Sequence, residues 1–310
     1  MKYKSLLILF FILMMTVVAQ DGVLRGHIEP VNGVAFSPDG RWLISVSDDL
    51  SVRVWDVDAR TLYKELYPHR SFVRRVVFNL AGDRMVTTSW DGTANVFRVQ
   101  GETFTTEARI PNFGSPVDAA AFSLDQTRLA LGVGDGTIRL MDTATWQEVS
   151  LLVVDGLHIR ALDFSPSFDT PILAAAVGFP ALQLYLWEPD TDTPFAMLDF
   201  SATDLAFLDE TTLIAVSDMG EILRWQDWQD EDEPTITTYE DVWFTSLAVY
   251  DDQIAAGTLD GEIYLWQDET LTVIDGGDPI NDLAFSVDGT LLAAGTDAGT
   301  VRLIAVDRAD

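Results

Sequence analysis

Three histidines and no cysteines limit the acid–base and nucleophilic chemistry that this chain of 310 residues can perform. His27 precedes Asp49, and a histidine paired with an aspartate resembles part of a catalytic triad. His69 precedes Asp91 at the same distance, so the pairing recurs along the chain and is better explained by a structural repeat. His158 stands alone. We therefore predict no catalytic residue.

The sequence also lacks the usual motifs for binding metals and phosphates. The chain has no glycine-rich phosphate loop of the strand-to-helix type and no pair of histidines at metal-ligand spacing. Two acidic stretches offer the oxygen ligands that Ca²⁺ prefers: the run from Asp227 to Glu233, and Asp190 with Asp192. Neither stretch has the spacing of a twelve-residue calcium loop, so a solvated surface is the simpler interpretation of both. We predict no metal site and no cofactor.

A hydrophobic position that recurs at intervals of about 40 residues organises the rest of the chain. Seven residues occupy this recurrent position: Phe36, Phe78, Phe122, Phe164, Phe207, Val249 and Phe285. A period of this length is typical of stacked four-stranded units, because one such unit cannot bury its own apolar faces. Seven units are enough to close a ring of blades that leaves only short, protected edges.

Each unit is predicted to contain an inner strand that ends at the recurrent position, followed by a middle, a third and an outer strand. Short alternating runs separated by Asp, Gly and Pro indicate strands joined by tight turns. Outer strands are predicted at Thr61–Leu66, Thr103–Ile110, Glu148–Val154, Pro194–Leu198, Thr235–Tyr239 and Thr270–Ile274. The seventh is missing at the C-terminus, and we expect the residues from Gln20 to Arg25 to pair with the last blade and close the ring. The predicted fold is an all-β, seven-bladed propeller of four-stranded antiparallel blades over residues 20–310.

The first unit carries the clearest motif, with Gly26-His27 before its inner strand and Trp55-Asp56 at the end of its third strand. It resembles the Trp-Asp (WD) repeat family of seven-bladed propellers, and the resemblance extends from Gly22 to Asp307. The resemblance implies that each well-formed blade holds a buried, hydrogen-bonded set of side chains. This set is complete in the first blade, as His27, Ser45, Asp49 and Trp55, and lacks only the tryptophan in the second, as His69, Thr87 and Asp91 with Phe97.

Polar side chains also recur at a fixed place, four residues before the recurrent hydrophobic position, although the residue before each of them is apolar. We expect this position to lie at one mouth of a central channel, together with the turns between middle and third strands. Exposed aromatic residues and arginines are favoured binding anchors. The predicted binding patch consists of Arg74, Trp90, Phe113, Arg160, Phe179 and Trp243. The alternative is that these side chains cover their own neighbours; as a binding site, the two arginines would receive an acidic segment or a carboxylate.

The first 19 residues predict a secretory signal peptide. Lys2 and Lys4 precede an apolar run, and the small residues before Gln20 permit cleavage there. The alternative is an uncleaved N-terminal membrane anchor, although the run is short for a membrane span. After cleavage we expect no membrane span and a secreted, periplasmic or extracellular location.

The chain has 49 acidic and 19 basic residues and a net charge of −30. A surface this negative repels phosphate backbones, so we expect no nucleic-acid partner. Together with the signal peptide, the resemblance implies an exported, monomeric, non-enzymatic scaffold that binds a protein or peptide. The alternative is a propeller that binds a small ligand or a glycan in a deep channel mouth lined by aromatic and polar groups. A degenerate hydrolase-like propeller would need acids or histidines clustered inside the channel, and we predict none there.

Overall fold

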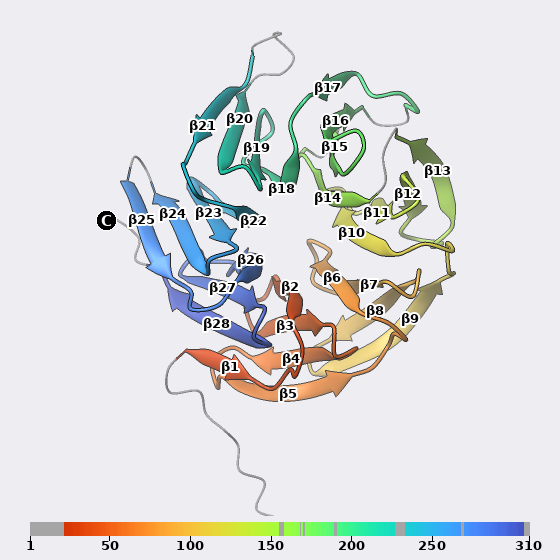
Figure 1. Ribbon diagram of the computed structural model, residues 1–310. Coiled ribbons are helices and arrows are strands. Elements are labelled where there is room, and N and C mark those ends of the chain that lie inside the picture. Colours follow the sequence, from red (N-terminus) through yellow and green to blue (C-terminus); the bar gives the residue numbers. More distant parts are fainter. Residues whose placement is uncertain are drawn as a thin grey trace, which may run out of the picture.

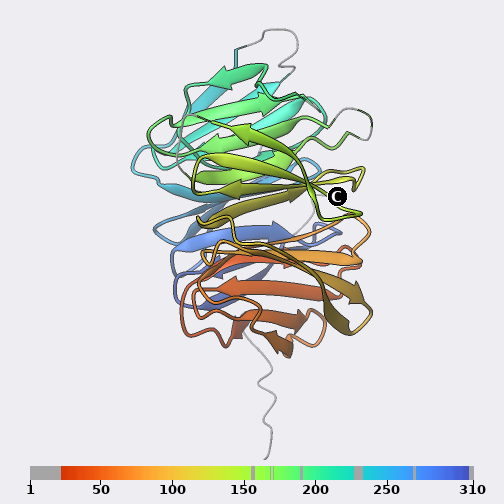
Figure 2. The ribbon, with the colours of Figure 1, turned by 90° about the vertical axis from the view of Figure 1, so that its right-hand side faces the viewer.

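The computed structural model describes residues 22–154, 158–167, 169, 171–188, 191–226, 233–267 and 270–306. These residues form seven four-stranded antiparallel sheets that radiate from a common axis (Figure 1). Figure 2 shows the same ring from the side. Within the described ranges there is no helix long and apolar enough to cross a membrane. The predicted all-β, seven-bladed propeller is confirmed.

Blades 1 to 6 follow the chain in order, from the inner strand outward. Blade 1 comprises β2 (Val31–Phe36), β3 (Trp42–Ser47), β4 (Val52–Asp56) and β5 (Thr61–Leu66). Blade 2 comprises β6 (Val73–Phe78), β7 (Arg84–Ser89), β8 (Ala94–Gln100) and β9 (Thr103–Ile110). Blade 3 comprises β10 (Val117–Phe122), β11 (Arg128–Val133), β12 (Thr137–Asp142) and β13 (Glu148–Val153). Blade 4 comprises β14 (Ile159–Phe164), β15 (Leu173–Val177), β16 (Gln183–Trp187) and β17 (Ala196–Leu198). Blade 5 comprises β18 (Ala202–Phe207), β19 (Thr212–Ser217), β20 (Glu221–Gln226) and β21 (Thr235–Thr238). Blade 6 comprises β22 (Phe244–Tyr250), β23 (Gln253–Thr258), β24 (Glu262–Gln267) and β25 (Thr270–Asp275).

Blade 7 is built from both ends of the described chain. It contains β26 (Ile280–Phe285), β27 (Leu291–Thr296), β28 (Thr300–Ala305) and, as its outer strand, β1 (Val23–Arg25). β1 pairs antiparallel with β28, with Leu24 opposite Val301, and Figure 1 shows the two strands side by side. The predicted closure of the ring by the N-terminal strand is confirmed. It matters because a paired last strand leaves no edge from which the ring would fray.

The predicted outer strands are also found, with small differences at their ends. β17 begins at Ala196 rather than at the predicted Pro194, and proline has no N–H to give to a strand ladder. Elsewhere the bounds differ from the prediction by no more than one residue.

The hydrophobic core lies between neighbouring blades. One cluster packs Trp42, Ile44 and Val54 of blade 1 against Val76 and Met85 of blade 2, and equivalent clusters join other neighbouring blades. The middle strands are buried on both faces; every residue of β3, β15 and β19 is buried. This explains why the middle strands read as nearly continuous small and apolar residues, whereas the third strands alternate. The rigid ring that results holds the inner strands around the channel.

Candidate functional site

Every inner strand contains a β-bulge at the same place. The pairing of the inner with the middle strand shifts register in all seven blades, between the residues five and three before the recurrent position, for example between Val31 and Gly33. A bulge leaves one residue unpaired and redirects its side chain. The seven bulge residues are Asn32, Arg74, Asp118, Arg160, Thr203, Thr245 and Asn281. The bulge is the physical reason why a polar residue follows an apolar one at this point of each repeat.

These bulge residues come together at one mouth of the channel. All seven line a pocket of about 370 Å³, with Arg75, Trp90 and His158 completing its wall. We call it the channel-mouth pocket. The arrangement places the recurrent polar position where the sequence predicted it.

Five of the seven bulge residues bond to the next blade. Each donates from its side chain to the carbonyl that lies five residues before the recurrent position of the following blade. The pairs are Asn32 to Val73, Arg160 to Ala202, Thr203 to Phe244, Thr245 to Ile280, and Asn281 to Val31. These bonds tie neighbouring blades together around the mouth and use the polar groups for the ring's own cohesion.

At the two remaining junctions, Arg74 and Asp118 make different contacts. Asp118 accepts a hydrogen bond from Trp90 Nε1 at 2.7 Å on one oxygen and from His158 Nδ1 at 3.3 Å on the other. The Arg74 guanidinium lies over the Trp90 indole, with Cζ 5.2 Å from the ring centroid. Arg74 Nε is 3.7 Å from Asp118 Oδ1, which is too long for a hydrogen bond. The ring of bulge-to-carbonyl bonds is therefore interrupted at blades 2 and 3, where the side-chain contacts of Asp118 replace it.

Arg74 keeps unused hydrogen-bond donors at this opening. Its Nε is buried and has no hydrogen-bond partner among the described residues, while its side chain is 33% exposed. Burial lowers the pKa of Arg74, and the charge of Asp118 opposes this shift. The guanidinium nevertheless stays charged at any physiological pH. The opening thus presents a positive group that lies over an aromatic ring and is ion-paired with Asp118.

The predicted patch divides into two groups. Arg74, Trp90 and Arg160 line the channel-mouth pocket, whereas Phe113, Phe179 and Trp243 are not among its lining residues. Phe113 packs against the core between blades 2 and 3, and Arg139 covers its ring with Cζ 5.1 Å from the centroid. Phe179 is 72% exposed and Trp243 is 45% exposed, each on a separate turn. Only the first group forms one site.

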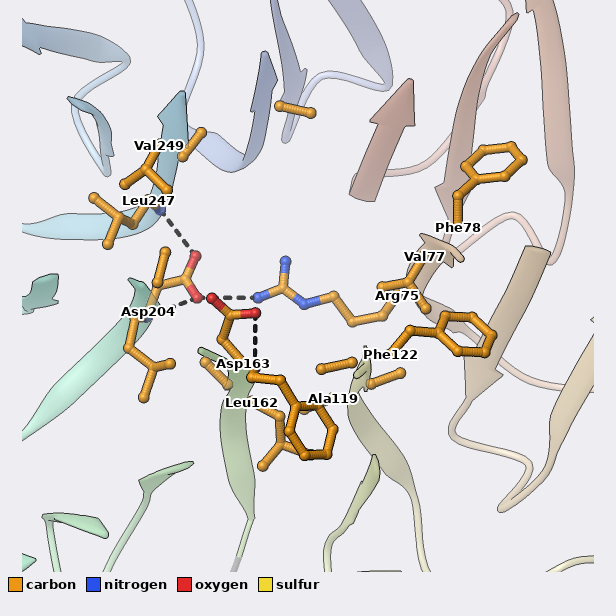
Figure 3. Close-up of a pocket in the computed structure, with 18 of the residues that line it drawn as sticks. Arg75, Val77, Phe78, Ala119, Phe122, Leu162, Asp163, Asp204, Leu247 and Val249 are labelled. Carbon is orange, nitrogen blue, oxygen red and sulfur yellow. Dashed lines mark hydrogen bonds and ion pairs between the residues drawn. The ribbon is translucent and has the colours of Figure 1, made fainter. Parts of the chain in front are cut away.

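Below the mouth, an arginine crosses the channel. Arg75 of blade 2 forms ion pairs with Asp204 of blade 5, at 3.5 Å, and with Asp282 of blade 7. Figure 3 shows Arg75 extending toward Asp204, with Asp163 close to that carboxylate. Each aspartate also accepts a backbone N–H from the next blade: Asp163 from Phe207, Asp204 from Leu247 and Asp282 from Val34. The three acids therefore connect inner strands as well as facing one another.

These charges are unevenly matched. Burial raises the pKa of Asp163 to about 7, and the nearby Asp204 adds to the shift. Two backbone N–H donors oppose it, but among the described residues no cation pairs with Asp163. Burial also raises the pKa of Asp204 to about 6 and raises that of Asp282, since one guanidinium shared between two carboxylates offsets only part of their desolvation. Burial alone would lower the pKa of Arg75, but the two aspartates raise it. Acids clustered inside the channel were not predicted, and that expectation is wrong.

The channel below Arg75 is open to the opposite face. A cavity of about 510 Å³ is lined by the charged residues just described and by aromatic side chains at the recurrent position, namely Phe78, Phe122, Phe164 and Phe285. Arg75 lines both this cavity and the channel-mouth pocket, so it separates the two.

The hydrogen-bonded set of the first blade forms a chain of contacts. Trp55 Nε1 donates to Ser45 Oγ at 2.8 Å, and Ser45 lies 2.7 Å from His27 Nε2. His27 Nδ1 lies 2.9 Å from Asp49. Burial lowers the pKa of His27 although Asp49 opposes the shift, so the imidazole is neutral, with Nδ1 as donor and Nε2 as acceptor. The Asp49 pKa is low because hydrogen bonds from His27 and Ser51 outweigh its burial.

The second blade has the same contacts without the tryptophan. His69 Nε2 lies 2.8 Å from Thr87 Oγ1 and its Nδ1 lies 3.3 Å from Asp91, while Phe97 fills the place of the indole. The pKa of His69 is again lowered by burial. Both histidines are enclosed between strands of one blade, away from the channel-mouth pocket, so the arrangement is structural. Of the acidic stretches considered for calcium, Asp190 and residues 227–232 lie outside the described residues.

Replacing Trp55 by phenylalanine tests the set. We expect Trp55→Phe to lower the free energy of unfolding by about 1 kcal/mol more than Trp187→Phe does. Both indoles are buried, but Trp187 Nε1 has no hydrogen-bond partner among the described residues, so only Trp55→Phe removes a bond. Chemical denaturation of the two variants measures the difference, and equal losses would show that the bond from Trp55 to Ser45 adds no stability.

Comparisons with known proteins agree with this architecture. The family model of the WD domain, G-beta repeat (WD40), matches residues 19–56, 60–98 and 268–304. Apoptotic protease-activating factor 1 of Rattus norvegicus is 23% identical over 295 residues, which cover 90% of this chain and 22% of that protein. Target of rapamycin complex subunit wat1 of Schizosaccharomyces pombe is 28% identical over 128 residues, which cover 41% of this chain and 40% of that protein. The chain thus matches less than half the length of either relative.

The fold has close structural counterparts as well. The crystal structure of the RRP9 WD40 repeats superposes with a TM-score of 0.82 at 18% sequence identity, covering 92% of this chain and 97% of that one. At such low identity the similarity shows the fold alone. Taken with the matched repeats at residues 19–56, 60–98 and 268–304, it shows that the chain contains WD40-type repeats and folds as a seven-bladed β-propeller.

Proposed function

We propose that this protein is an exported, monomeric interaction scaffold that binds a segment of another protein in the channel-mouth pocket. The observation that carries the proposal is the open sector on blades 2 and 3. There Trp90, which is 43% exposed, and Arg74 line the pocket. Apart from Arg74 and Asp118, every bulge residue donates a hydrogen bond to the next blade. Exposed tryptophan and arginine in a concave site are the residue types that dominate binding energy at protein interfaces.

The relatives support a role in assembly. The Schizosaccharomyces pombe relative is named as a subunit of a complex, and we extend that kind of role to this chain. The predicted signal peptide, which lies outside the described residues, supports export. N-terminal sequencing of the protein recovered from the medium and from the membrane fraction of the producing cells tests this: we expect a start at Gln20 in the medium if the signal peptide is cleaved, and at Met1 in the membrane fraction if it remains as an anchor.

A second candidate is a propeller that binds a small ligand, and the cavity below Arg75 favours it. That cavity combines an aromatic rim with convergent charged groups, which is the usual composition of a small-molecule site. It opens on the opposite face from Trp90. Dependence of binding on Trp90 therefore distinguishes the two candidates.

The Trp90→Ala variant tests the proposed function. We expect it to reduce capture of the partner from the extracellular fraction about tenfold or more, because truncation removes a binding anchor of the pocket. Wild-type and variant proteins are immobilised at equal density, and retained proteins are quantified by mass spectrometry. Thermal unfolding of each variant is measured separately, so that loss of folding is not taken for loss of binding.

Phe179→Ala is the matched control. Phe179 is another exposed aromatic residue on a turn between middle and third strands, but it does not line the pocket. Its truncation should leave capture unchanged. A protein captured equally by wild type and by a folded Trp90→Ala variant would contradict the proposal.

A further inference from the structure

The open sector at the channel mouth has a definite chemical preference. Both oxygens of Asp118 already accept hydrogen bonds, one from Trp90 and one from His158. Arg74 forms an ion pair with Asp118 at 3.7 Å, which is too long for a hydrogen bond, and its buried Nε has no hydrogen-bond partner among the described residues. An outside acceptor does not reach the buried Nε, but it can meet the exposed part of the Arg74 side chain, which is 33% exposed and lines the pocket.

The shape of the donor identifies the acceptor. A guanidinium presents its N–H groups in a planar fork that matches a carboxylate. Contact with Trp90 restricts the Arg74 guanidinium, whose Cζ lies 5.2 Å from the ring centroid, so less conformational freedom is lost on binding. Arg160 adds a second positive group to the same pocket.

We propose that Arg74 and Arg160 receive the side-chain carboxylate of an aspartate or glutamate in the docked protein segment. This inference rests on the proposed function and names the chemistry that the partner must carry. It also accounts for two arginines that project into a shared mouth on a chain of net charge −30.

A protein segment fits the site better than a free anion does. One ion pair in a solvated pocket gives little affinity by itself. A segment gains additional contact with the exposed part of Trp90 and with the pocket wall. The carboxylate then provides orientation and specificity, and the apolar contact provides affinity.

Peptide selection on the whole protein tests the inference. Short random peptides with both ends blocked are selected on wild-type protein, so that chain-terminal carboxylates cannot contribute. The enriched peptides are resynthesised with each acidic residue changed to its amide. We expect one such change to weaken binding to wild type about tenfold, because it removes a charge-assisted pair of hydrogen bonds. The same change should have little effect on binding to Arg74→Gln.

Two variants keep the result interpretable. Arg98→Gln removes the same charge from the same blade, at a partly exposed ion pair with Glu107 outside the pocket, and should bind the peptides as wild type does. Arg74→Lys keeps the charge but loses the planar fork, and should restore binding only in part. Thermal unfolding of all variants confirms that they are folded.

The contrary outcomes separate this inference from the proposed function. Enriched peptides that lack acidic residues, yet lose binding to Trp90→Ala, would overturn the carboxylate and leave the proposed function intact. An equal effect of the amide change on wild type and on Arg74→Gln would also overturn it. Enriched peptides that bind Trp90→Ala normally, or no enrichment at all, would count against both.

Discussion

Replacing Arg75 by methionine is expected to lower the free energy of unfolding by about 3 kcal/mol near pH 8. The change keeps most of the side-chain volume but leaves Asp204 and Asp282 facing the channel without their cation. Removing one partner of a buried ion pair is costly because the remaining charge stays desolvated. We place the loss at the low end of the usual range, because the Arg75 side chain is 21% exposed to the channel.

The loss should shrink as the pH falls. Both aspartates have pKa values raised by burial, and without Arg75 these values rise further. Near pH 5 the folded variant therefore binds protons and escapes most of the penalty. Urea denaturation at both pH values measures the effect. Arg98→Met, which removes a partly exposed ion pair with Glu107, is the control and should change stability by no more than about 0.5 kcal/mol.

A loss within that control range near pH 8 would show that Arg75 does not serve as a cross-channel ion pair. Combining Arg75→Met with Asp282→Asn gives a further check. Asparagine keeps an oxygen to accept the N–H of Val34 but carries no charge, so the double variant should recover part of the lost stability.

The architecture was predictable because it repeats. Each blade must bury the same faces against its neighbours, so hydrophobic residues recur at the same positions seven times. A deviation from the pattern in one copy therefore does not change the prediction, because the other copies still show it. The missing outer strand of blade 7 was equally informative, because β1 alone remained to fill it. The end of an outer strand, by contrast, depends on single residues such as Pro194, and there the prediction was off by two residues.

The channel was not predictable in the same way. The residues three before the recurrent position include Arg75, Asp204 and Asp282, and this shared offset was the available signal. Whether they meet depends on which blades face one another across the ring, and that is a property of the closed fold. The position of Asp163 in the channel was even harder to predict, because this residue lies directly before Phe164 rather than three residues before the recurrent position.

The predicted patch failed to gather for a related reason. The sequence places Trp90 and Phe179 on equivalent turns of different blades, but equivalent turns lie at different points around the ring. Trp90 turns to the channel because Asp118 and Arg74 hold its indole. Phe179 is not among the residues lining that pocket. Local side-chain contacts therefore decide which exposed aromatic residues line the mouth.

Asp163 should make the stability of this protein depend on pH in a direction opposite to that of an ordinary ion-paired acid. Its folded-state pKa of about 7 lies above the ordinary value, so the folded state binds a proton more tightly than the unfolded state does. The penalty for holding this carboxylate in the channel is therefore full above about pH 7 and is relieved as the pH falls toward 4. His27 and His69 act in the opposite sense, because their lowered pKa values stabilise the fold above about pH 6.5.

The contribution of Asp163 is isolated by comparing wild type with Asp163→Asn, in which the other titrating groups are shared. We expect the stability of wild type relative to the variant to rise by about 2 kcal/mol between about pH 8 and pH 5, allowing for contact of Asp163 with channel water. Asp288→Asn is the control: hydrogen bonds from Ser286 and Thr290 hold the pKa of Asp288 at about 2, so it stays ionised throughout and its difference from wild type should be flat. A flat difference for Asp163→Asn as well would mean that channel water solvates Asp163 fully. The uncompensated acid beside Asp204 would then carry no energetic cost, and the acids of the channel would behave as surface groups.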